Sequence, residues 1–298
     1  MIQIGKLPRI DRKKLAVIHT DDMLKNYSDE IECSINYSKI YTRDGLFLSD
    51  DTPISETITR PKGVLPDSMC PPFDTKIFVS KHDTVTELFL MPEDVRVAVL
   101  NFASYKNPGG MYYEGSAAQE EFLCHHSTLY PVLENFRAAY YAPHKTSLNR
   151  ALYTDTALYS MCITFFDYQL LYGDGDERLS CKVNGTREAD VITCAAPNRG
   201  TFERYQCSHP LTEETKKLLY DAMYRRCELV LETAKVNGVR YLILGAFGCG
   251  VFGNDPTQVA EIFYKLLNTT YSGVFKEVRF AIPIGNDGNN LAFKKVFY

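Results

Sequence analysis

Short runs of apolar residues alternate along this chain with longer segments in which apolar residues recur every three or four positions. The runs are typical of buried β-strands, and they span residues 76–80, 97–100, 160–166, 189–196, 241–247 and 278–282. The longer segments predict amphipathic helices, and they span residues 85–91, 118–132, 211–236 and 255–267. Because strands and helices alternate, we expect a layered α/β fold with a largely parallel or mixed sheet.

The first quarter of the chain follows a different pattern. We interpret residues 1–75 as an N-terminal accessory extension and residues 76–298 as the main domain, the two forming one compact unit. In the extension, residues 15–27 predict a short helix, and the alternating residues 31–42 predict a strand. Residues 50–73 are polar and contain several prolines, so they predict an extended surface segment. Later in the chain we expect a turn-rich loop at 173–180 and a Gly- and Asn-rich tail after residue 282.

The helix predicted after residue 117 has a recognisable start. Ser116 can act as its N-cap, and Gln119 follows three residues later, so the two fit a capping box. Pro131 is expected to end or kink this helix one residue earlier. The start places Glu120 and Glu121 in the first two turns, beside a loop rich in glycine.

A second helix start follows another glycine-rich loop. Asp255 can cap this helix, Pro256 suits its first position, and Gln258 stands three residues after the cap. We therefore expect the helix to begin at the end of that loop.

Charge and cysteine usage limit the possible environments and partners. The net charge near −4 and the lack of a Lys/Arg cluster give no reason to expect attraction to a phosphate backbone. The start of the chain lacks the apolar centre of a signal peptide, and no stretch approaches the roughly 18 apolar residues of a membrane span. Nine cysteines without a CxxC pair suggest reduced thiols in a cytoplasmic protein, or a nuclear one in a eukaryote. The six histidines show no metal-ligand spacing, so no metal is expected.

Three loops follow apolar strands, at residues 104–116, 197–201 and 248–254. In a parallel sheet the carboxyl ends of the strands meet at one edge, so these loops should lie close together. Two of them are rich in glycine and precede helices, an arrangement whose free backbone N–H groups bind phosphate well. One such loop is usually a tight turn, but two beside a glutamate pair favour a pyrophosphate site. Phe252, between glycines, could press on a sugar or a base.

Several of these residues also have a purely structural interpretation. An isolated pair such as Glu120 and Glu121 is typical of a solvated helix face. His125 lies four residues after Glu121 and could contact it, although packing or capping is the more common role. Cys249 lies between glycines but has no basic neighbour in sequence, which argues against a nucleophile.

Asn198 and Arg199 follow a strand at the expected ligand edge. Contact with a ligand and ordinary turn chemistry both remain open for them.

The sequence blocks NPGG, AQEE and STLY, followed by CAAPN and LGAFGCGVFGNDP, closely resemble those of the microbial-type poly(ADP-ribose) glycohydrolases. The resemblance covers the chain from about Leu15 to its end. It implies a three-layer α/β/α macrodomain fold with a helical N-terminal extension. It also implies hydrolysis of the ribose–ribose bonds of poly(ADP-ribose) with release of ADP-ribose, without a metal or other cofactor.

The resemblance assigns a role to each part of the site. Glu121 would be the catalytic acid/base, while Glu120 would support the sugar and Gln119 would shape the loop. Asn107 would contact a ribose hydroxyl, and Phe252 would pack near the distal ribose. The residues expected to bind substrate are Asn107, Gly109, Gly110, Gln119, Asn198, Gly248, Cys249, Gly250, Val251, Phe252, Gly253 and Asn254.

Protonation of the catalytic pair is not decided by the sequence. A helix N-terminus favours the charged form of Glu121, whereas burial and the neighbouring Glu120 favour the protonated form.

One departure from the family pattern concerns substrate range. The family signature usually has three glycines, but here Gly109 and Gly110 are followed by Met111, Tyr112 and Tyr113. We therefore consider three functions. The first is an exo-acting poly(ADP-ribose) glycohydrolase acting on modified proteins. The second is a hydrolase of single ADP-ribose units on protein or nucleic acid, which is the only case that involves nucleic acid. The third is a reader that binds ADP-ribose without cleaving it. No membrane partner is expected.

Overall fold

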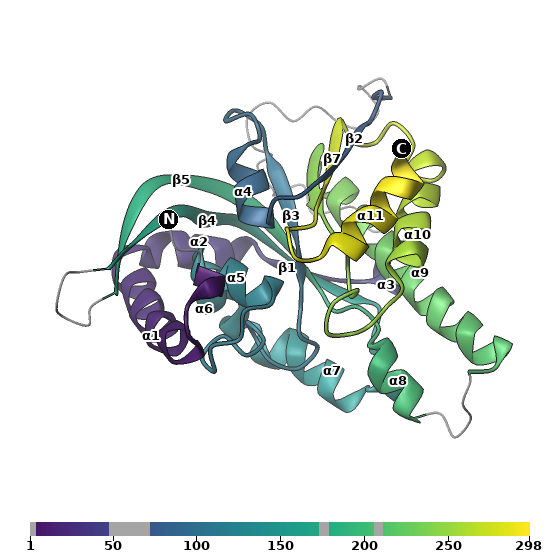
Figure 1. Ribbon diagram of the computed structural model, residues 1–298, viewed down its shortest axis with the longest axis horizontal. Coiled ribbons are helices and arrows are strands. Elements are labelled where there is room, and N and C mark those ends of the chain that lie inside the picture. Colours follow the sequence, from purple (N-terminus) through teal and green to yellow (C-terminus); the bar gives the residue numbers. More distant parts are fainter. Residues whose placement is uncertain (1–3, 48–71, 173–178, 206–210) are drawn as a thin grey trace.

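The computed structural model describes residues 4–47, 72–172, 179–205 and 211–298. Within these residues a seven-stranded sheet crosses the molecule, with helices on both of its faces (Figure 1). The strands are β1 (Lys39–Thr42), β2 (Lys76–Ser80), β3 (Val97–Phe102), β4 (Thr156–Tyr172), β5 (Leu179–Cys194), β6 (Tyr241–Leu244) and β7 (Glu277–Ala281). Their order across the sheet is β1–β4–β5–β3–β6–β7–β2. The strands from β5 to β2 run parallel, whereas β4 is antiparallel to both of its neighbours.

The α-helices of the described residues are α1 (Arg9–Asn26), α2 (Ser28–Tyr37), α3 (Arg43–Phe47), α4 (Thr84–Phe89), α5 (Gln119–His125), α6 (Leu129–Asn135), α7 (Ala142–Thr146), α8 (Arg199–Tyr205), α9 (Glu213–Val236), α10 (Pro256–Asn268) and α11 (Asp287–Phe297).

Along the central strands, successive side chains point to opposite faces of the sheet and enter two separate hydrophobic cores. Leu100 and Leu242 pack with residues of α9, α10 and α11 on one face. Val99 and Ile243 pack with residues of α1, α2, α4, α5 and α6 on the other. The expected three-layer α/β/α fold is therefore confirmed.

Segments in which apolar residues recur with a clear helical or strand spacing form the predicted helices and strands. Strand β2 has the predicted bounds, and β3, β7, α4 and α9 lie within a few residues of theirs. At the start of α10, the Asp255 carboxylate accepts hydrogen bonds from the N–H groups of Thr257 and Gln258, at 2.8 and 3.4 Å. Pro256 occupies the first helical position. The second predicted helix start is therefore confirmed.

The strand predicted across residues 31–42 is wrong for most of its length. Residues 31–37 belong to the helix α2, and only Lys39–Thr42 form a strand. Ile31 and Ser34 are buried three residues apart, and the Ser34 hydroxyl donates to the carbonyl of Cys162 at 3.0 Å. In so short a segment the polar and apolar residues fit both periods, and packing against β4 selects the helix.

The helix predicted across residues 118–132 is two helices. Helix α5 ends at His125 because the chain then pairs with the edge of β4. The Thr128 N–H donates to the Thr164 carbonyl at 3.0 Å, and the His126 carbonyl accepts from the Phe166 N–H at 2.7 Å. Pro131 does not end a helix. It lies in the first turn of α6, where its missing N–H leaves no intrahelical bond unmade.

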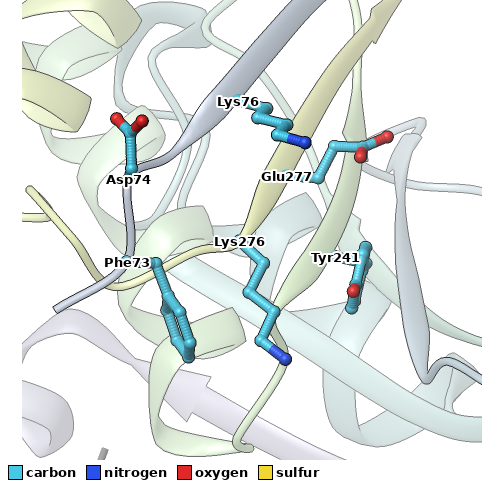
Figure 2. A pocket seen from close by; sticks show the side chains of 6 residues that line it. All are labelled: Phe73, Asp74, Lys76, Tyr241, Lys276 and Glu277. Carbon is cyan, nitrogen blue, oxygen red and sulfur yellow. The ribbon is translucent and has the colours of Figure 1, made fainter. Parts of the chain in front are cut away.

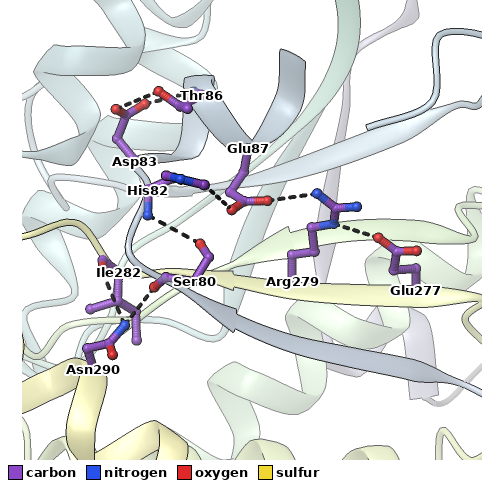
Figure 3. Close-up of polar contacts among 9 residues, drawn as sticks. All are labelled: Ser80, His82, Asp83, Thr86, Glu87, Glu277, Arg279, Ile282 and Asn290. Atoms are coloured by element: carbon purple, nitrogen blue, oxygen red, sulfur yellow. Dashed lines mark hydrogen bonds and ion pairs between the residues drawn. The ribbon is translucent and has the colours of Figure 1, made fainter. Parts of the chain in front are cut away.

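Two further segments differ from the prediction. The tail after residue 282 contains the helix α11, which buries Phe293 and Asn290. The Asn290 amide donates to the carbonyl of Ser80 at 2.6 Å and of Ile282 at 3.4 Å, which fixes the helix to the sheet (Figure 3). Strands β4 and β5 are much longer than expected because they pair along a long antiparallel hairpin. The loop predicted at 173–180 and the segment at 50–73 lie largely outside the described residues.

Helix α4 is fixed to the sheet by a buried carboxylate (Figure 3). Glu87 accepts hydrogen bonds from Arg279 of β7 at 2.9 Å and from the His82 ring at 2.8 Å. Burial alone would raise the pKa of Glu87, but hydrogen bonds from Ser80, Arg279 and His82 hold it below its usual value. No helix in the described ranges combines the length and the apolar character needed to cross a membrane.

Candidate active site

Gln119 joins the start of α5 to the carboxyl end of β3. Its side-chain oxygen accepts from the Phe102 N–H at 2.9 Å, and its amide donates to the Leu100 carbonyl at 2.8 Å. The amide also donates to the Thr84 hydroxyl of α4 at 3.2 Å. Gln119 therefore shapes the loop by pairing with the strand as another strand would.

This use of Gln119 corrects the prediction of a capping box. The N-cap of α5 is Ala118, and no side chain in the described residues caps the helix. The Ser116 N–H instead donates to the Met111 carbonyl at 3.1 Å, within the loop. The error moves the helix start by two residues and leaves Glu120 and Glu121 in its first turn.

Glu120 is almost fully buried, with 3% of its surface exposed. One carboxylate oxygen accepts from the Ser104 N–H at 2.6 Å. The other accepts from the Asn101 amide at 3.4 Å, and that amide also donates to the Thr193 hydroxyl at 3.2 Å. Burial raises the pKa of Glu120 well above its usual value, and the adjacent Glu121 raises it further. Both oxygens of Glu120 are therefore engaged by the protein.

Glu121 differs from its neighbour because only one of its oxygens is engaged. That oxygen accepts from the Met111 N–H at 2.8 Å. The other is buried and has no hydrogen-bond partner among the residues that the structure describes. A buried carboxylate oxygen without a partner is costly, so this atom is the natural contact for a bound ligand.

Gly110 explains how the loop approaches the two carboxylates so closely. Its φ is +62°, and a Cβ at this position would lie 2.5 Å from a Glu121 oxygen and 3.1 Å from a Glu120 oxygen. Gly109 also has a positive φ, and a Cβ there would lie 2.6 Å from the ring of Tyr130. Both glycines are required by backbone conformation and by space.

The other two predicted loops form one unit at the same sheet edge. The Gly200 N–H donates to the Phe252 carbonyl at 3.1 Å. The Asn254 amide donates to the carbonyls of Pro197 and Gly248, at 2.8 and 3.0 Å, so this side chain is used to close the loops. Since β5, β3 and β6 are parallel neighbours, the loop after β3 opens at the same edge. The structure therefore brings the three predicted loops together.

Backbone donors in the loop after β6 remain available. Within the described chain, the N–H groups of Gly250, Val251 and Phe252 make no hydrogen bond to protein. Val251 is 87% exposed, and a Cβ at Gly250 would meet open space. Consecutive free N–H groups of this kind form a concave site for an anion.

Some predicted site residues have structural contacts instead. The Asn198 side chain accepts from the Thr201 N–H at 2.9 Å, which is ordinary turn chemistry. His125 is buried against the ring of Tyr112, and burial lowers its pKa well below the usual value. No hydrogen bond joins it to Glu121 in the described residues, so packing accounts for it. Burial raises the pKa of the Cys249 thiol to about 12, which does not suit a nucleophile.

Sequence reasoning missed two aromatic residues that line this edge. Tyr153 stacks on Tyr105 with ring centroids 4.1 Å apart, and its ring lies 6.4 Å from that of Phe252. Tyr153 thus connects the loop after β3 to the loop after β6.

The backbone that presents Tyr153 is strained. Positive φ angles of 42°, 54°, 72° and 60° occur at Asn149, Arg150, Ala151 and Tyr153, none of which is glycine. The fully buried Arg226 supports the segment by donating to the carbonyls of Leu152, at 3.1 Å, and of Ala195. No local sequence signal could have revealed this, because Arg226 lies more than 70 residues away.

A separate pocket of about 230 Å³ lies at the opposite edge of the sheet. It is lined by the starts of β2, β6 and β7, at Phe73, Asp74, Lys76, Tyr241, Lys276 and Glu277 (Figure 2). The strand ends that carry the three loops point away from it, so it contains none of the candidate catalytic residues.

Comparison with known proteins agrees with this geometry. Residues 24–167 match the family described as microbial-type PARG, catalytic domain. The poly(ADP-ribose) glycohydrolase of Deinococcus radiodurans, solved in complex with ADP-ribose, is 30% identical over 90% of this chain and 96% of that one, with a TM-score of 0.68. The chain belongs to the microbial-type poly(ADP-ribose) glycohydrolase family.

Other members of this family are similar over almost their whole length. The poly(ADP-ribose) glycohydrolase of Thermomonospora curvata is 28% identical over 97% of this chain and all of that one, with a TM-score of 0.75. The same enzyme bound to the inhibitor ADP-HPD gives a TM-score of 0.72 at 28% identity, over 96% and 98% of the two chains. No curated protein sequence matches the chain.

Proposed function

We propose that this protein is a poly(ADP-ribose) glycohydrolase that hydrolyses ribose–ribose O-glycosidic bonds and releases ADP-ribose. The observation that carries the proposal is the buried oxygen of Glu121 that has no hydrogen-bond partner in the described part of the chain, held beside a glycine loop in a member of this family. We expect the enzyme to act at chain ends, on polymer attached to modified proteins.

The loops suggest how ADP-ribose would be bound. The N–H groups of residues 250–252, which make no hydrogen bond within the described residues, suit the diphosphate because they are consecutive neutral donors in a glycine-rich loop. Phe252 lies near Tyr153, which stacks on Tyr105, and the three rings offer an apolar surface for a ribose or the adenine. Asn107, at the mouth of the loop after β3, would contact a ribose hydroxyl.

Glu121 would serve as both acid and base. In the protonated form it gives its proton to the oxygen that leaves the ribose, as the C–O bond breaks and positive charge develops on the sugar. As a carboxylate it then takes a proton from water, whose oxygen bonds to the ribose carbon and completes hydrolysis. The Met111 N–H holds one oxygen so that the other can face the substrate. Glu120 would support the ribose from its buried position.

A second candidate is hydrolysis of single ADP-ribose units attached to protein or nucleic acid. Met111 and Tyr113 are 47% and 38% exposed, and Met111 directly contacts Glu121 through its backbone. These side chains would meet whatever is attached to the departing oxygen, so they bear on which leaving group fits. A reader without activity is disfavoured, since simple binding gives no reason for a buried carboxylate oxygen that finds no partner among the described residues.

Three substrates separate these functions. The protein is incubated with automodified, poly(ADP-ribosyl)ated protein, with mono-ADP-ribosylated protein and with mono-ADP-ribosylated nucleic acid, and free ADP-ribose is quantified. We expect release of ADP-ribose from the polymer, with the last unit left on the protein. Release only from the mono-modified substrates would replace the first candidate by the second. If the protein binds ADP-ribose but releases none from any of the three substrates, it is a non-catalytic ADP-ribose-binding protein.

A further inference from the structure

Helix α1 of the N-terminal extension is hydrogen-bonded to the loop that precedes α5, the helix that carries Glu121 (Figure 1). The Arg9 guanidinium donates through Nε to the Glu114 carbonyl at 2.7 Å. The Arg12 guanidinium donates through Nε to the Gly115 carbonyl at 2.8 Å. These contacts join residues more than 100 positions apart in the chain.

The two backbones meet without room for a side chain. Gly115 has a φ of +72°, and a Cβ there would lie 2.4 Å from the Arg9 carbonyl oxygen. Nearby, the buried Tyr112 hydroxyl donates to the Ala16 carbonyl of α1 at 3.1 Å. The loop is therefore held by α1 at three points, Tyr112, Glu114 and Gly115.

The turn held by α1, residues 111–116, is hydrogen-bonded to the Glu121 carboxylate. The Gly115 N–H donates to the Tyr112 carbonyl at 3.0 Å, which makes residues 111–116 a compact turn together with the bond from Ser116 to Met111. The N–H of Met111, at the other end of this turn, is the hydrogen-bond donor to Glu121. A shift of the turn would move that donor.

We propose that α1 is a positioning element for catalysis and that Arg12 is its main positioning residue. Arg12 holds the loop more firmly than Arg9, because its side chain is partly buried and also donates hydrogen bonds to the carbonyls of Leu7 and Gly5. It thereby fixes the start of the chain and the catalytic turn to the same helix. This inference rests on the proposed role of Glu121.

The test compares Arg12→Met and Arg12→Lys with Lys14→Met, an exposed control on the same helix. Lysine keeps the charge but cannot donate to several carbonyls in the planar geometry of a guanidinium. For both Arg12 variants we expect kcat on poly(ADP-ribose) to fall about tenfold, which corresponds to about 1.4 kcal/mol. KM and the Kd for ADP-ribose, measured by calorimetry, should stay within about twofold, and Lys14→Met should match the native chain.

An unchanged kcat in folded Arg12 variants would overturn this inference, as would equal losses in kcat and ADP-ribose affinity, which indicate general damage to the fold. If Arg12→Met fails to fold, Arg12→Lys and the exposed Arg9→Met decide by the same criteria. A native chain without activity on polymer would instead contradict the proposed function, so the two failures are distinguishable.

Discussion

Single residues of the loop after β3 are constrained by distance as much as by chemistry. Gly110 is the clearest case, since its backbone is left-handed and its missing Cβ makes room for two carboxylates. The contiguous signature predicted that this loop lies beside both glutamates, and the structure brings them together.

Gly110→Ala should therefore reduce activity severely. The added methyl group would displace the Glu121 carboxylate, and the left-handed backbone would cost about 1–2 kcal/mol. We expect kcat to fall by about two orders of magnitude, as a misplaced acid implies. Gly288→Ala is the matched control because a Cβ there meets nothing within 4 Å and its φ is not positive. Equal activity of both variants would show that the close approach is unimportant.

Two aromatic residues at this sheet edge could not be found from the sequence. Tyr153 reaches Tyr105 from a strained segment in which Asn149, Arg150, Ala151 and Tyr153 have positive φ angles, and Arg226 holds that segment. Strain of this kind is imposed by tertiary contacts and has no signature in residue type.

Among the helices and strands, the prediction was right where the apolar positions followed one period, helical or alternating. It was wrong where a segment fitted both periods. Helices α9 and α10 have long apolar stripes, whereas α2 is short and reads equally well as an alternating strand. Helix α11 was missed because glycine and asparagine fill its first turn, and its contacts with Ser80 of β2 and with Ile282 stabilise it.

Helix α4 supports the site through Thr84, and its own attachment is testable. The pKa of Glu87 is held low in the folded state, so its ion pair stabilises the fold above about pH 4.5 and loses this effect as pH falls further. Glu87→Gln should lower the free energy of unfolding by about 3 kcal/mol at pH 7, since it breaks a buried pair. The difference should shrink below pH 4 in urea denaturation.

Glu134→Gln provides the control for that experiment. Glu134 also pairs with an arginine, at 2.5 Å, but its side chain is 40% exposed. An exposed pair contributes little, so we expect a change below about 1 kcal/mol. If both variants lose the same stability at pH 7, burial is not the source of the effect at Glu87.

At the scale of the whole molecule, the parallel strands bring three distant loops to one sheet edge, and this was predictable. The order of the strands and the long β4–β5 hairpin were not, because register depends on contacts that no local pattern encodes. Most buried residues of this fold are apolar and stabilise it. Glu120 and Glu121 are an exception, because they place two adjacent carboxyl groups in the interior.

This burial should destabilise the molecule as pH rises. The folded-state pKa of Glu120 is raised, so the folded protein holds a proton that the unfolded chain releases, and stability falls with increasing pH. Glu120→Gln should therefore raise the free energy of unfolding at pH 8 by about 1 kcal/mol, with a smaller gain at pH 5. The exposed Glu261→Gln should show no such trend. A loss of stability at pH 8 in Glu120→Gln would contradict this reasoning.

We propose that Glu121 supplies the proton while the surrounding loops bind the substrate. The decisive experiment measures ADP-ribose release from automodified protein with Glu121→Gln, alongside calorimetric binding of ADP-ribose to the same variant. Glutamine can still accept from the Met111 N–H but has no proton to deliver. We predict a loss of release of at least about a thousandfold with binding within about threefold of the native chain. Release at the native rate would contradict the assignment of Glu121 as the catalytic acid.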